Sequence, residues 1–193
     1  MRKLVLFLMV AGCALFARAA DLDGMVLEEE SDSSRWYCSV APGVMWFEKD
    51  ASARTTGCGA LRFGYEHNRT VALEFGGLVA PSVKSNGGRW RGVGQIYGVH
   101  ADALAHLDLS YFELYGRWFD PYVSAGAGVY GSNKRAFGKD RAAFAPRLGL
   151  GAMSHLTERV SLRADAVGQC LMNRGTRFAA GFEIGLVWHF GGG

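Results

Sequence analysis

Beyond its first twenty residues, this chain lacks long apolar runs. No later stretch approaches the eighteen consecutive apolar residues that a membrane-spanning helix requires, because Gly, Arg, Asp, Glu or His interrupts each one. A spanning helix is therefore excluded for this part of the chain. Its length of about 170 residues is enough for one domain with a real core, and no second composition regime begins after residue 36.

Cysteine is scarce, and so are ligand motifs. Of the four cysteines, Cys38, Cys58 and Cys170 follow the first twenty residues, and an odd number leaves at least one unpaired. Because the strands predicted below place none of the three opposite another, we expect free thiols. The cysteines and histidines show no metal-ligand spacing, and no phosphate-binding glycine-rich loop precedes a helix. We therefore expect no metal ion and no cofactor.

The first twenty residues indicate export. Two basic residues follow the initial Met, residues 4–16 are almost wholly apolar, and an Ala-Arg-Ala triplet at 17–19 offers small residues for cleavage. The sequence therefore predicts a signal peptide at 1–20. The alternative is a lipoprotein box that would leave Cys13 acylated, but apolar residues continue past this cysteine and argue against it.

Residues 21–193 carry no formal net charge, because the +3 of the whole chain comes from three basic residues in the predicted signal peptide. Residues 21–35 then hold six acids and one base without a periodic apolar pattern, so we expect a disordered periplasmic tether. The remaining segment, 36–193, carries the balancing positive charge and holds the folded domain.

From residue 36 onward, apolar side chains recur at every second position, which is the spacing of one face of a β-strand. The pattern is clearest in 177–190, where all even positions are apolar and the odd positions include Arg177, Glu183 and His189. Pro42 fits a strand only at a bulge or a poorly hydrogen-bonded position. The predicted strands are 36–47, 56–66, 70–79, 96–113, 119–131, 143–154, 159–170 and 178–190.

The connections between these strands differ in length. Those at 66–69, 115–120 and 155–159 are short, whereas 80–95 and 131–142 are longer and rich in Gly, Asn, Lys and Arg. Short periplasmic turns and longer outer loops are typical of outer-membrane barrels, although the other two loops are only modest in length. The sequence therefore predicts an all-β fold, an eight-stranded antiparallel up-and-down transmembrane β-barrel.

The second face of the strands distinguishes this prediction from a soluble β-sandwich or a soluble periplasmic ligand-binding barrel, whose apolar face would point inward. In this chain the non-apolar face of the strands is rich in glycine and charged residues, and small residues fit the narrow lumen of an eight-stranded barrel. Buried charges are costly unless they are paired. We predict a lumen charge network of Arg62, Glu66, Glu74, Asp102, Asp108, Arg147, Arg159, Arg163, Asp165, Arg177 and Glu183.

Aromatic residues lie near the predicted strand ends, where amphipathic rings occupy the lipid–water boundary of a membrane protein. We expect this position for Trp36, Trp46, Phe47, Tyr65, Trp118, Phe119, Trp188 and Phe190.

Two segments resemble the OmpA-like outer-membrane β-barrel family. Residues 121–132, PYVSAGAGVYGS, are similar to its fifth strand, and residues 147–168, RLGLGAMSHLTERVSLRADAVG, are similar to its sixth and seventh strands with their turn. The resemblance covers essentially the whole predicted barrel. It implies the fold and a location in the cell outer membrane, and it leaves the activity open.

The end of the chain resembles the carboxy-terminal aromatic signal of the same family, which the outer-membrane assembly machinery reads. The resemblance implies this role for Gly185, Trp188 and Phe190. Two features depart from the family: a tail of three glycines displaces the aromatic residue from the last position, and no peptidoglycan-binding domain follows the barrel.

The four predicted outer loops, 48–55, 80–95, 131–142 and 171–177, hold eleven bases against three acids. Guanidinium groups suit multivalent phosphate contacts, so we expect the outer rim to contact lipopolysaccharide or another anionic surface. The alternative is that these charges are merely solvated. The candidate anion-binding residues are Lys84, Arg89, Arg91, Lys134, Arg135, Lys139, Arg141 and Arg174.

An enzyme is the competing class, because some eight-stranded barrels are lipid A deacylases or acyltransferases. Such chemistry needs a nucleophile or a base next to an ordering acid. The nearest sets are Ser154, His155 and Glu158, in a predicted tight turn, and His106, Asp108 and Ser110, on one inward face. We expect no catalysis and no nucleic acid partner. We expect a monomer whose partners are outer-membrane lipids, lipopolysaccharide and the assembly machinery.

Overall fold

The computed structural model describes residues 34–48, 55–82, 85–86, 89–90, 94–107, 119–133, 142–172 and 176–191. The predicted signal peptide, Cys13 and all but the last residues of the predicted tether lie outside these ranges. No helix in the described part of the chain is long and apolar enough to cross a membrane.

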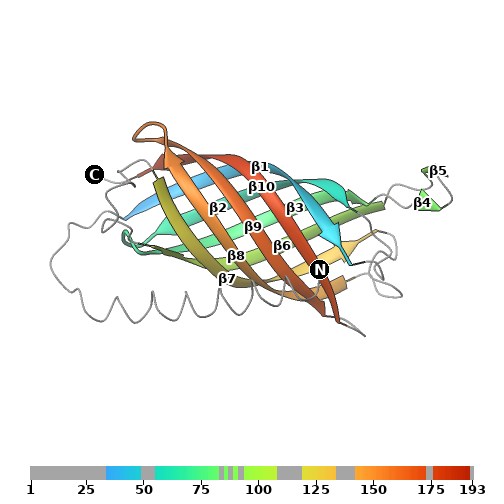
Figure 1. The fold of residues 1–193 in the computed structure, drawn as a ribbon. Coiled ribbons are helices and arrows are strands. Elements are labelled where there is room, and N and C mark those ends of the chain that lie inside the picture. The colour runs from blue at the N-terminus through green and yellow to red at the C-terminus, as the bar shows by residue number, and fades with distance from the viewer. Residues whose placement is uncertain are drawn as a thin grey trace.

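Eight strands form one closed barrel (Figure 1). Each strand pairs antiparallel with its neighbour in the chain, and the last strand pairs with the first to close the ring. The predicted all-β, eight-stranded antiparallel barrel is therefore confirmed. The strands are β1 (Arg35–Phe47), β2 (Thr56–Glu66), β3 (Val71–Ser82), β6 (Gly94–His106), β7 (Phe119–Ser132), β8 (Ala142–His155), β9 (Val160–Met172) and β10 (Thr176–Phe190).

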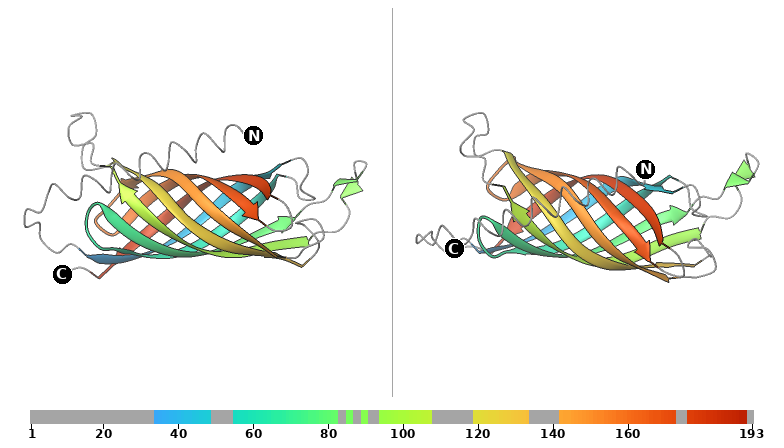
Figure 2. Two further views of the ribbon diagram at one scale, coloured as in Figure 1. Left: turned by 90° about the horizontal axis from the view of Figure 1, so that it is seen from below. Right: turned by 60° about the horizontal axis from the view of Figure 1, so that its bottom comes forward.

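A second, very small sheet lies outside the barrel. β4 (Ser85–Asn86) pairs with β5 (Arg89–Trp90) between β3 and β6. Both views of Figure 2 show this pair beyond one end of the barrel, and they show the barrel strands tilted against its axis, as closure of a sheet requires.

One strand boundary was predicted wrongly. β6 ends at His106 rather than at residue 113, and residues 108–118, with most of the turn predicted at 115–120, lie outside the described part of the chain. The neighbouring strand gives the reason: β3 begins at Val71, which pairs with Ala105. The last backbone bond on this side joins the His106 N–H to Thr70 O at 2.7 Å, after which the turn at 67–70 replaces β3, whereas on the other side the Leu107 N–H still donates to Pro121 O at 2.8 Å.

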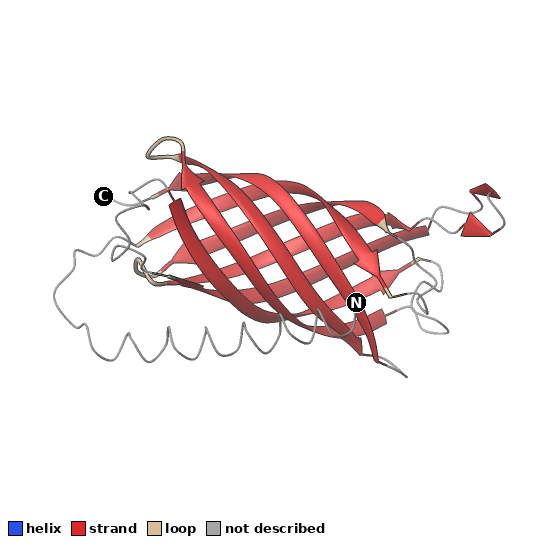
Figure 3. Cartoon of the chain, viewed as in Figure 1, coloured by secondary structure: helices blue, strands red, loops and turns tan. Residues whose placement is uncertain are grey.

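The two ends of the barrel differ. The turns at 67–70 and 156–159, the start of β1 and the end of β10 lie together at one end (Figure 3). Both turns are fixed by local side chains: the Asn68 carboxamide accepts the Val71 N–H at 2.6 Å, and the Thr157 hydroxyl accepts the Val160 N–H at 3.0 Å. Short turns mark the periplasmic end of such barrels, so the four predicted basic loops leave from the outer end.

The outward face of the strands is apolar. Its large side chains are 36–63% exposed, although they belong to a closed and fully paired sheet. A water-soluble barrel would expose charge at these positions, whereas lipid accepts them. This outer belt includes Trp36, Val40, Val44, Trp46, Leu61, Phe63, Leu73, Phe75, Val79, Val99, Val129, Phe144, Leu162, Phe182, Ile184, Leu186, Trp188 and Phe190.

Four of the eight predicted boundary aromatics, Trp36, Trp46, Trp188 and Phe190, lie on the outer belt. At the periplasmic end, the Trp36 ring stacks on Phe63 at 5.1 Å and contacts Tyr65 at 4.7 Å. Phe47 is the exception, because it points inward and is buried among lumen residues. The odd-numbered side chains of β1 point inward, and Phe47 follows this alternation. The prediction had relied instead on its position near a strand end. Trp118 lies outside the described residues.

Pro42 lies at the gap in hydrogen bonding that its missing N–H requires. The ladder between β1 and β10 pairs Val40 with Leu186 and Gly43 with Glu183, and it skips the two residues between Val40 and Gly43. The prediction for Pro42 is confirmed. Cys38, Cys58 and Cys170 are free thiols, also as predicted.

Glycines make room for tyrosines inside the barrel. Three inward tyrosines each lie directly opposite a glycine of the neighbouring strand, where a Cβ would overlap the aromatic ring. The narrow lumen therefore holds large side chains because the opposite wall lacks them. The three pairs are Tyr37 with Gly64, Tyr122 with Gly151 and Tyr130 with Gly98.

Candidate functional site in the barrel lumen

The centre of the lumen holds a cluster of paired charges. Seven of the eleven residues predicted for the lumen network meet there, and each is only 2–7% exposed. They come from six strands, so only closure of the barrel brings them together. The seven are Arg62 of β2, Glu74 of β3, Asp102 of β6, Arg147 of β8, Arg163 and Asp165 of β9, and Glu183 of β10.

Arg62 contacts three carboxylates. Its Nε lies 3.4 Å from Glu74 Oε1, its Nη1 lies 3.5 Å from Asp165 Oδ2, and its Nη2 donates to Glu183 Oε2. Arg163 supports two of the same acids, because its Nε donates to Asp165 Oδ2 at 2.8 Å and its Nη1 donates to Glu74. Two guanidinium groups thus hold three buried carboxylates in one network.

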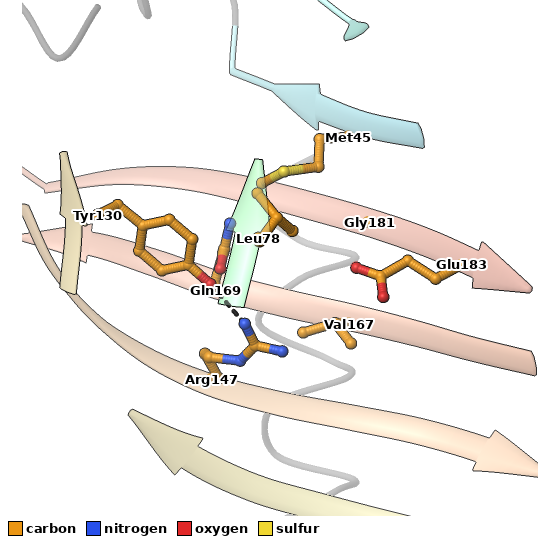
Figure 4. Close-up of a pocket in the computed structure, with 8 residues that line it drawn as sticks. All are labelled: Met45, Leu78, Tyr130, Arg147, Val167, Gln169, Gly181 and Glu183. Atoms are coloured by element: carbon orange, nitrogen blue, oxygen red, sulfur yellow. Dashed lines mark hydrogen bonds between the residues drawn. The ribbon is translucent and has the colours of Figure 1, made fainter. Parts of the chain in front are cut away.

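Arg147 forms a second branch of this network. Its Nη2 lies 3.3 Å from Asp102 Oδ2, and its Nη1 donates to the Tyr130 hydroxyl (Figure 4). Beside it lies a cavity of about 10 Å³, which is room for roughly one water molecule. Its lining residues are Met45, Leu78, Tyr130, Arg147, Val167, Gln169, Gly181 and Glu183.

Two further tyrosines bond to the central carboxylates. The Tyr37 hydroxyl donates to Glu74 Oε2 at 2.9 Å, and the Tyr122 hydroxyl donates to Asp165. The Arg163 guanidinium also lies 5.1 Å from the centre of the Tyr122 ring, within the range of a cation–π contact. Sequence reasoning missed these tyrosines, although an inward tyrosine facing a glycine is a signal it could have used.

Apolar side chains close the lumen on both sides of the charges, which the sequence did not predict. Near the outer end the buried cluster includes Met45, Phe47, Leu78, Ile96 and Leu171. Near the periplasmic end it includes Tyr37, Leu104, Tyr122, Met153 and Val187. The interior is therefore a packed core, with apolar layers around a polar centre.

Four predicted network residues do not join this centre. Arg159 is exposed in the turn before β9 begins, where strand alternation no longer applies. Arg177 is half-buried at the outer end of β10, opposite Leu171. Glu66 instead bonds to Arg35 at the periplasmic end, and Asp108 lies outside the described residues.

A second polar group lines the periplasmic end of the lumen. Its inward side chains come from seven strands, and we call it the periplasmic ring. It comprises Arg35, Glu66, His106, Asp120, His155, Ser161 and His189.

Contacts link the members of the periplasmic ring one after another. His106 Nδ1 lies 2.7 Å from Asp120 Oδ2, and His155 Nε2 lies 4.0 Å from the same oxygen. His155 Nδ1 lies 2.7 Å from Ser161 Oγ, which lies 3.0 Å from His189 Nε2. Sequence reasoning had selected His106 and His155 but gave each other partners, because nothing in the chain reveals which strands become neighbours at this end.

The two constellations that the enzyme alternative would use are not assembled in the described residues. Ser154 lies on the outward face of β8, opposite to its neighbour His155, and Glu158 is exposed in the turn. Of the second set only His106 is described. The serine that His155 does contact, Ser161, is 0% exposed, so no substrate reaches its hydroxyl in this conformation.

Glu74, His100 and Asp102 bring potential metal ligand atoms within 4.8 Å of one another. Both carboxylates already contact guanidinium groups, from Arg163 and Arg147, and all three side chains are buried. The positive charge that a metal ion would supply there is thus provided by arginine.

The structure places three of the remaining predicted site residues, those of the predicted assembly signal. Trp188 and Phe190 are exposed on the outer belt, whereas Gly185 faces inward against Ala41. The side chains of the eight candidate anion-binding residues lie outside the described part of the chain.

A closed barrel with an apolar outer belt and a charge-paired, packed lumen defines the class: a small outer-membrane β-barrel protein, located in the outer membrane as the sequence predicted. Known structures agree with this fold. Neisserial surface protein A (NspA) is 14% identical, with a TM-score of 0.60 over 84% of this chain and 100% of that chain.

Two other solved barrels are similarly related. Ail, the attachment invasion locus protein of Yersinia pestis, is 14% identical, with a TM-score of 0.53 over 81% of this chain and 97% of that chain. The N-terminal β-barrel domain of Pseudomonas aeruginosa OprF is 18% identical, with a TM-score of 0.53 over 83% and 100%. No family model matches the chain, and no curated protein matches it. The resemblance to OmpA-like barrels is thus confirmed at the level of the fold.

Proposed function

We propose that this protein is a non-conducting outer-membrane anchor whose basic outer loops contact the phosphates of lipopolysaccharide. The observation that carries the proposal is the packed lumen. Because paired charges and two apolar layers fill the interior, transport through the barrel is not its task. The surface that remains for recognition is the outer end, where the base-rich loops leave the strands.

A structural neighbour supports this choice of ligand chemistry. The Ail barrel, 14% identical to this chain, has been solved in complex with sucrose octasulfate, a heparin analogue. A barrel of this size therefore binds a polyanion, and arginine suits such ligands through paired N–H donors. The same chemistry would hold the phosphates of lipopolysaccharide beside the barrel and contribute to envelope integrity.

The test is a quadruple variant that removes four positive charges, Arg89→Gln, Arg91→Gln, Lys134→Gln and Arg135→Gln. We expect it to lose most of the lipopolysaccharide that co-purifies with the wild-type barrel in detergent, because each change removes a phosphate contact. The measurement is the amount of lipopolysaccharide per barrel after washing at fixed ionic strength, since salt screens such contacts.

The control removes charge from the other end of the molecule. Arg69→Gln with Arg159→Gln changes the two periplasmic turns and should leave lipopolysaccharide retention unchanged, whereas Arg89→Gln with Arg91→Gln should lower it. Equal retention by all of these variants would show that the loop bases are merely solvated.

We also propose that the protein is not an enzyme and works as a monomer, with the outer-membrane assembly machinery and membrane lipids as its other partners. Ser161 is the only serine of the periplasmic ring, and it is buried. Overproduction should therefore leave the acyl chains of lipid A unchanged by mass spectrometry. A lost acyl chain would establish the deacylase alternative.

A further inference from the structure

The charges at the centre of the lumen do not balance. The seven residues of the central cluster are three arginines and four carboxylates, so this part of the described chain is one positive charge short. The other titratable groups that line the centre are His100 and the tyrosines Tyr37, Tyr122 and Tyr130, and tyrosine hydroxyls carry no charge at neutral pH. A buried group whose charge is not compensated usually becomes neutral by taking up or losing a proton.

Asp102 is the central carboxylate with the weakest support. Each of the other three accepts a hydrogen bond from an arginine, and two of them also accept one from a tyrosine. Asp102 Oδ2 lies 3.3 Å from Arg147 Nη2, but Asp102 Oδ1 is buried and has no hydrogen-bond partner in the described part of the chain.

The strands on either side of Asp102 favour its neutral form. On β3 the residue directly opposite is Glu74, and the two carboxyl groups bring oxygens within 4.8 Å of each other. On β7 the residue opposite is Gly126, which has no side chain that could donate a hydrogen bond. Two carboxylates this close disfavour each other's ionised form.

His100 offers an acceptor for the proton of a neutral Asp102. It lies on the same inward face of β6, is 2% exposed, and places its Nε2 3.7 Å from Asp102 Oδ2. Both of its ring nitrogens are buried and have no hydrogen-bond partner in the described residues. A Cβ at Gly76 would overlap the ring, so the glycine on β3 leaves the space that the imidazole fills.

We propose that the closed barrel binds one proton at Asp102, which is held as a carboxylic acid that donates to His100. With this proton the centre carries three positive and three negative charges. A neutral acid beside a neutral imidazole also avoids a further buried ion pair, which transfer of the proton to His100 would create among three arginines.

The bound proton makes the stability of the barrel depend on pH. In an unfolded chain an aspartic acid loses its proton at about pH 4 and a histidine at about pH 6.5. Above about pH 6.5 the folded barrel therefore holds one proton more at this pair than the unfolded chain does, and its stability falls as the pH rises. The pair alone should raise the unfolding equilibrium constant about tenfold per pH unit.

Urea unfolding of the full chain in lipid vesicles, from about pH 7 to about pH 8.5, tests this dependence. Asp102→Asn keeps the shape of the acid without its proton, so its unfolding constant should rise about tenfold less per pH unit than that of the wild type. Glu158→Gln removes an exposed carboxylate of the periplasmic turn and should keep the slope of the wild type. The same slope for Asp102→Asn and the wild type would overturn the proposal.

Asp165→Asn tests whether the proton belongs to Asp102. Asp165 accepts hydrogen bonds from Arg163 Nε at 2.8 Å and from Arg163 Nη2 at 3.2 Å, which requires an ionised carboxylate. At about pH 7, Asp165→Asn should raise the unfolding constant about tenfold or more beyond the effect of Asp102→Asn. Equal effects of the two changes would contradict the assignment to Asp102.

Infrared spectroscopy of the wild-type barrel detects the proton without any variant. We expect the C=O stretching band of one buried carboxylic acid at neutral pH, shifted by isotope-labelled aspartic acid and not by labelled glutamic acid. The absence of this band, or a shift with the glutamic acid label alone, would overturn the proposal. Dialysis against a metal chelator should leave the unfolding constant unchanged, because a loss of stability would mean that a bound cation supplies the missing charge.

Discussion

Arg62 links three carboxylates in the lumen, because its guanidinium contacts Glu74, Asp165 and Glu183. A buried ion pair adds little net stability compared with apolar residues of the same shape, but breaking it leaves an uncompensated buried charge. The carboxylates are therefore the reason that this arginine is needed.

Arg62→Ala should lower the free energy of unfolding by about 3–5 kcal/mol, since up to three buried carboxylates lose a partner. Urea unfolding in lipid vesicles, followed by tryptophan fluorescence, measures the change. Arg159→Ala is the matched control in an exposed turn, where we expect an effect within about 0.5 kcal/mol. Equal stabilities of the two variants would mean that the charges are not paired inside the barrel.

Gly151→Ala tests the packing of tyrosine on glycine. The added methyl group overlaps the Tyr122 ring, and overpacking of this kind costs about 1–3 kcal/mol. Gly59→Ala is the control, because a Cβ there meets no atom within 4 Å. It should be neutral or slightly stabilising in the same urea experiment, and a loss as large as that of Gly151→Ala would contradict the packing described for Tyr122.

Strand alternation in the sequence was enough to predict that Arg62, Glu74 and Glu183 point inward, because each lies within a long strand whose apolar side chains recur at every second position. It failed for Arg159, which precedes its strand. Alternation does not predict which arginine pairs with which carboxylate. These ion pairs depend on the relative stagger of strands that are distant in the chain. The periplasmic ring was missed for the same reason.

At the scale of the element, the strands followed the sequence closely where both neighbours are long. β2 has the predicted bounds, and the others except β6 differ from the prediction by at most three residues at either end. β6 was predicted too long because its neighbour β3 begins at Val71, so that the turn at 67–70 takes the place of a ladder partner on that side. Strand length in a barrel is set by pairs of strands, which a single stretch of sequence does not contain.

The lipid-facing side of a strand can be tested by inserting a charge. Leu61 lies in the middle of β2 on the outer belt, so Leu61→Arg should cost about 2–4 kcal/mol of folding free energy in a bilayer. Leu156→Arg makes the same change at another exposed leucine, in the periplasmic turn, and should cost about 1 kcal/mol or less. If both changes cost the same, the outer belt is not in contact with lipid.

For the whole molecule, the packed interior predicts the absence of a pore. The charged centre and the two apolar layers fill the lumen, and the cavity beside Arg147 has room for roughly one water molecule. In planar lipid bilayers the purified protein should pass little or no current. Stable, stepwise conductance in proportion to inserted protein would contradict the packed lumen.

The fold as a whole depends on a ring of strands that stays closed in detergent, with lipid outside and ionised groups paired within. Gel mobility of the membrane fraction with and without heating examines this property. We predict that the unheated protein migrates faster than the boiled protein, because a closed barrel resists unfolding by detergent and remains compact. A single mobility, unchanged by boiling, would contradict the closed barrel.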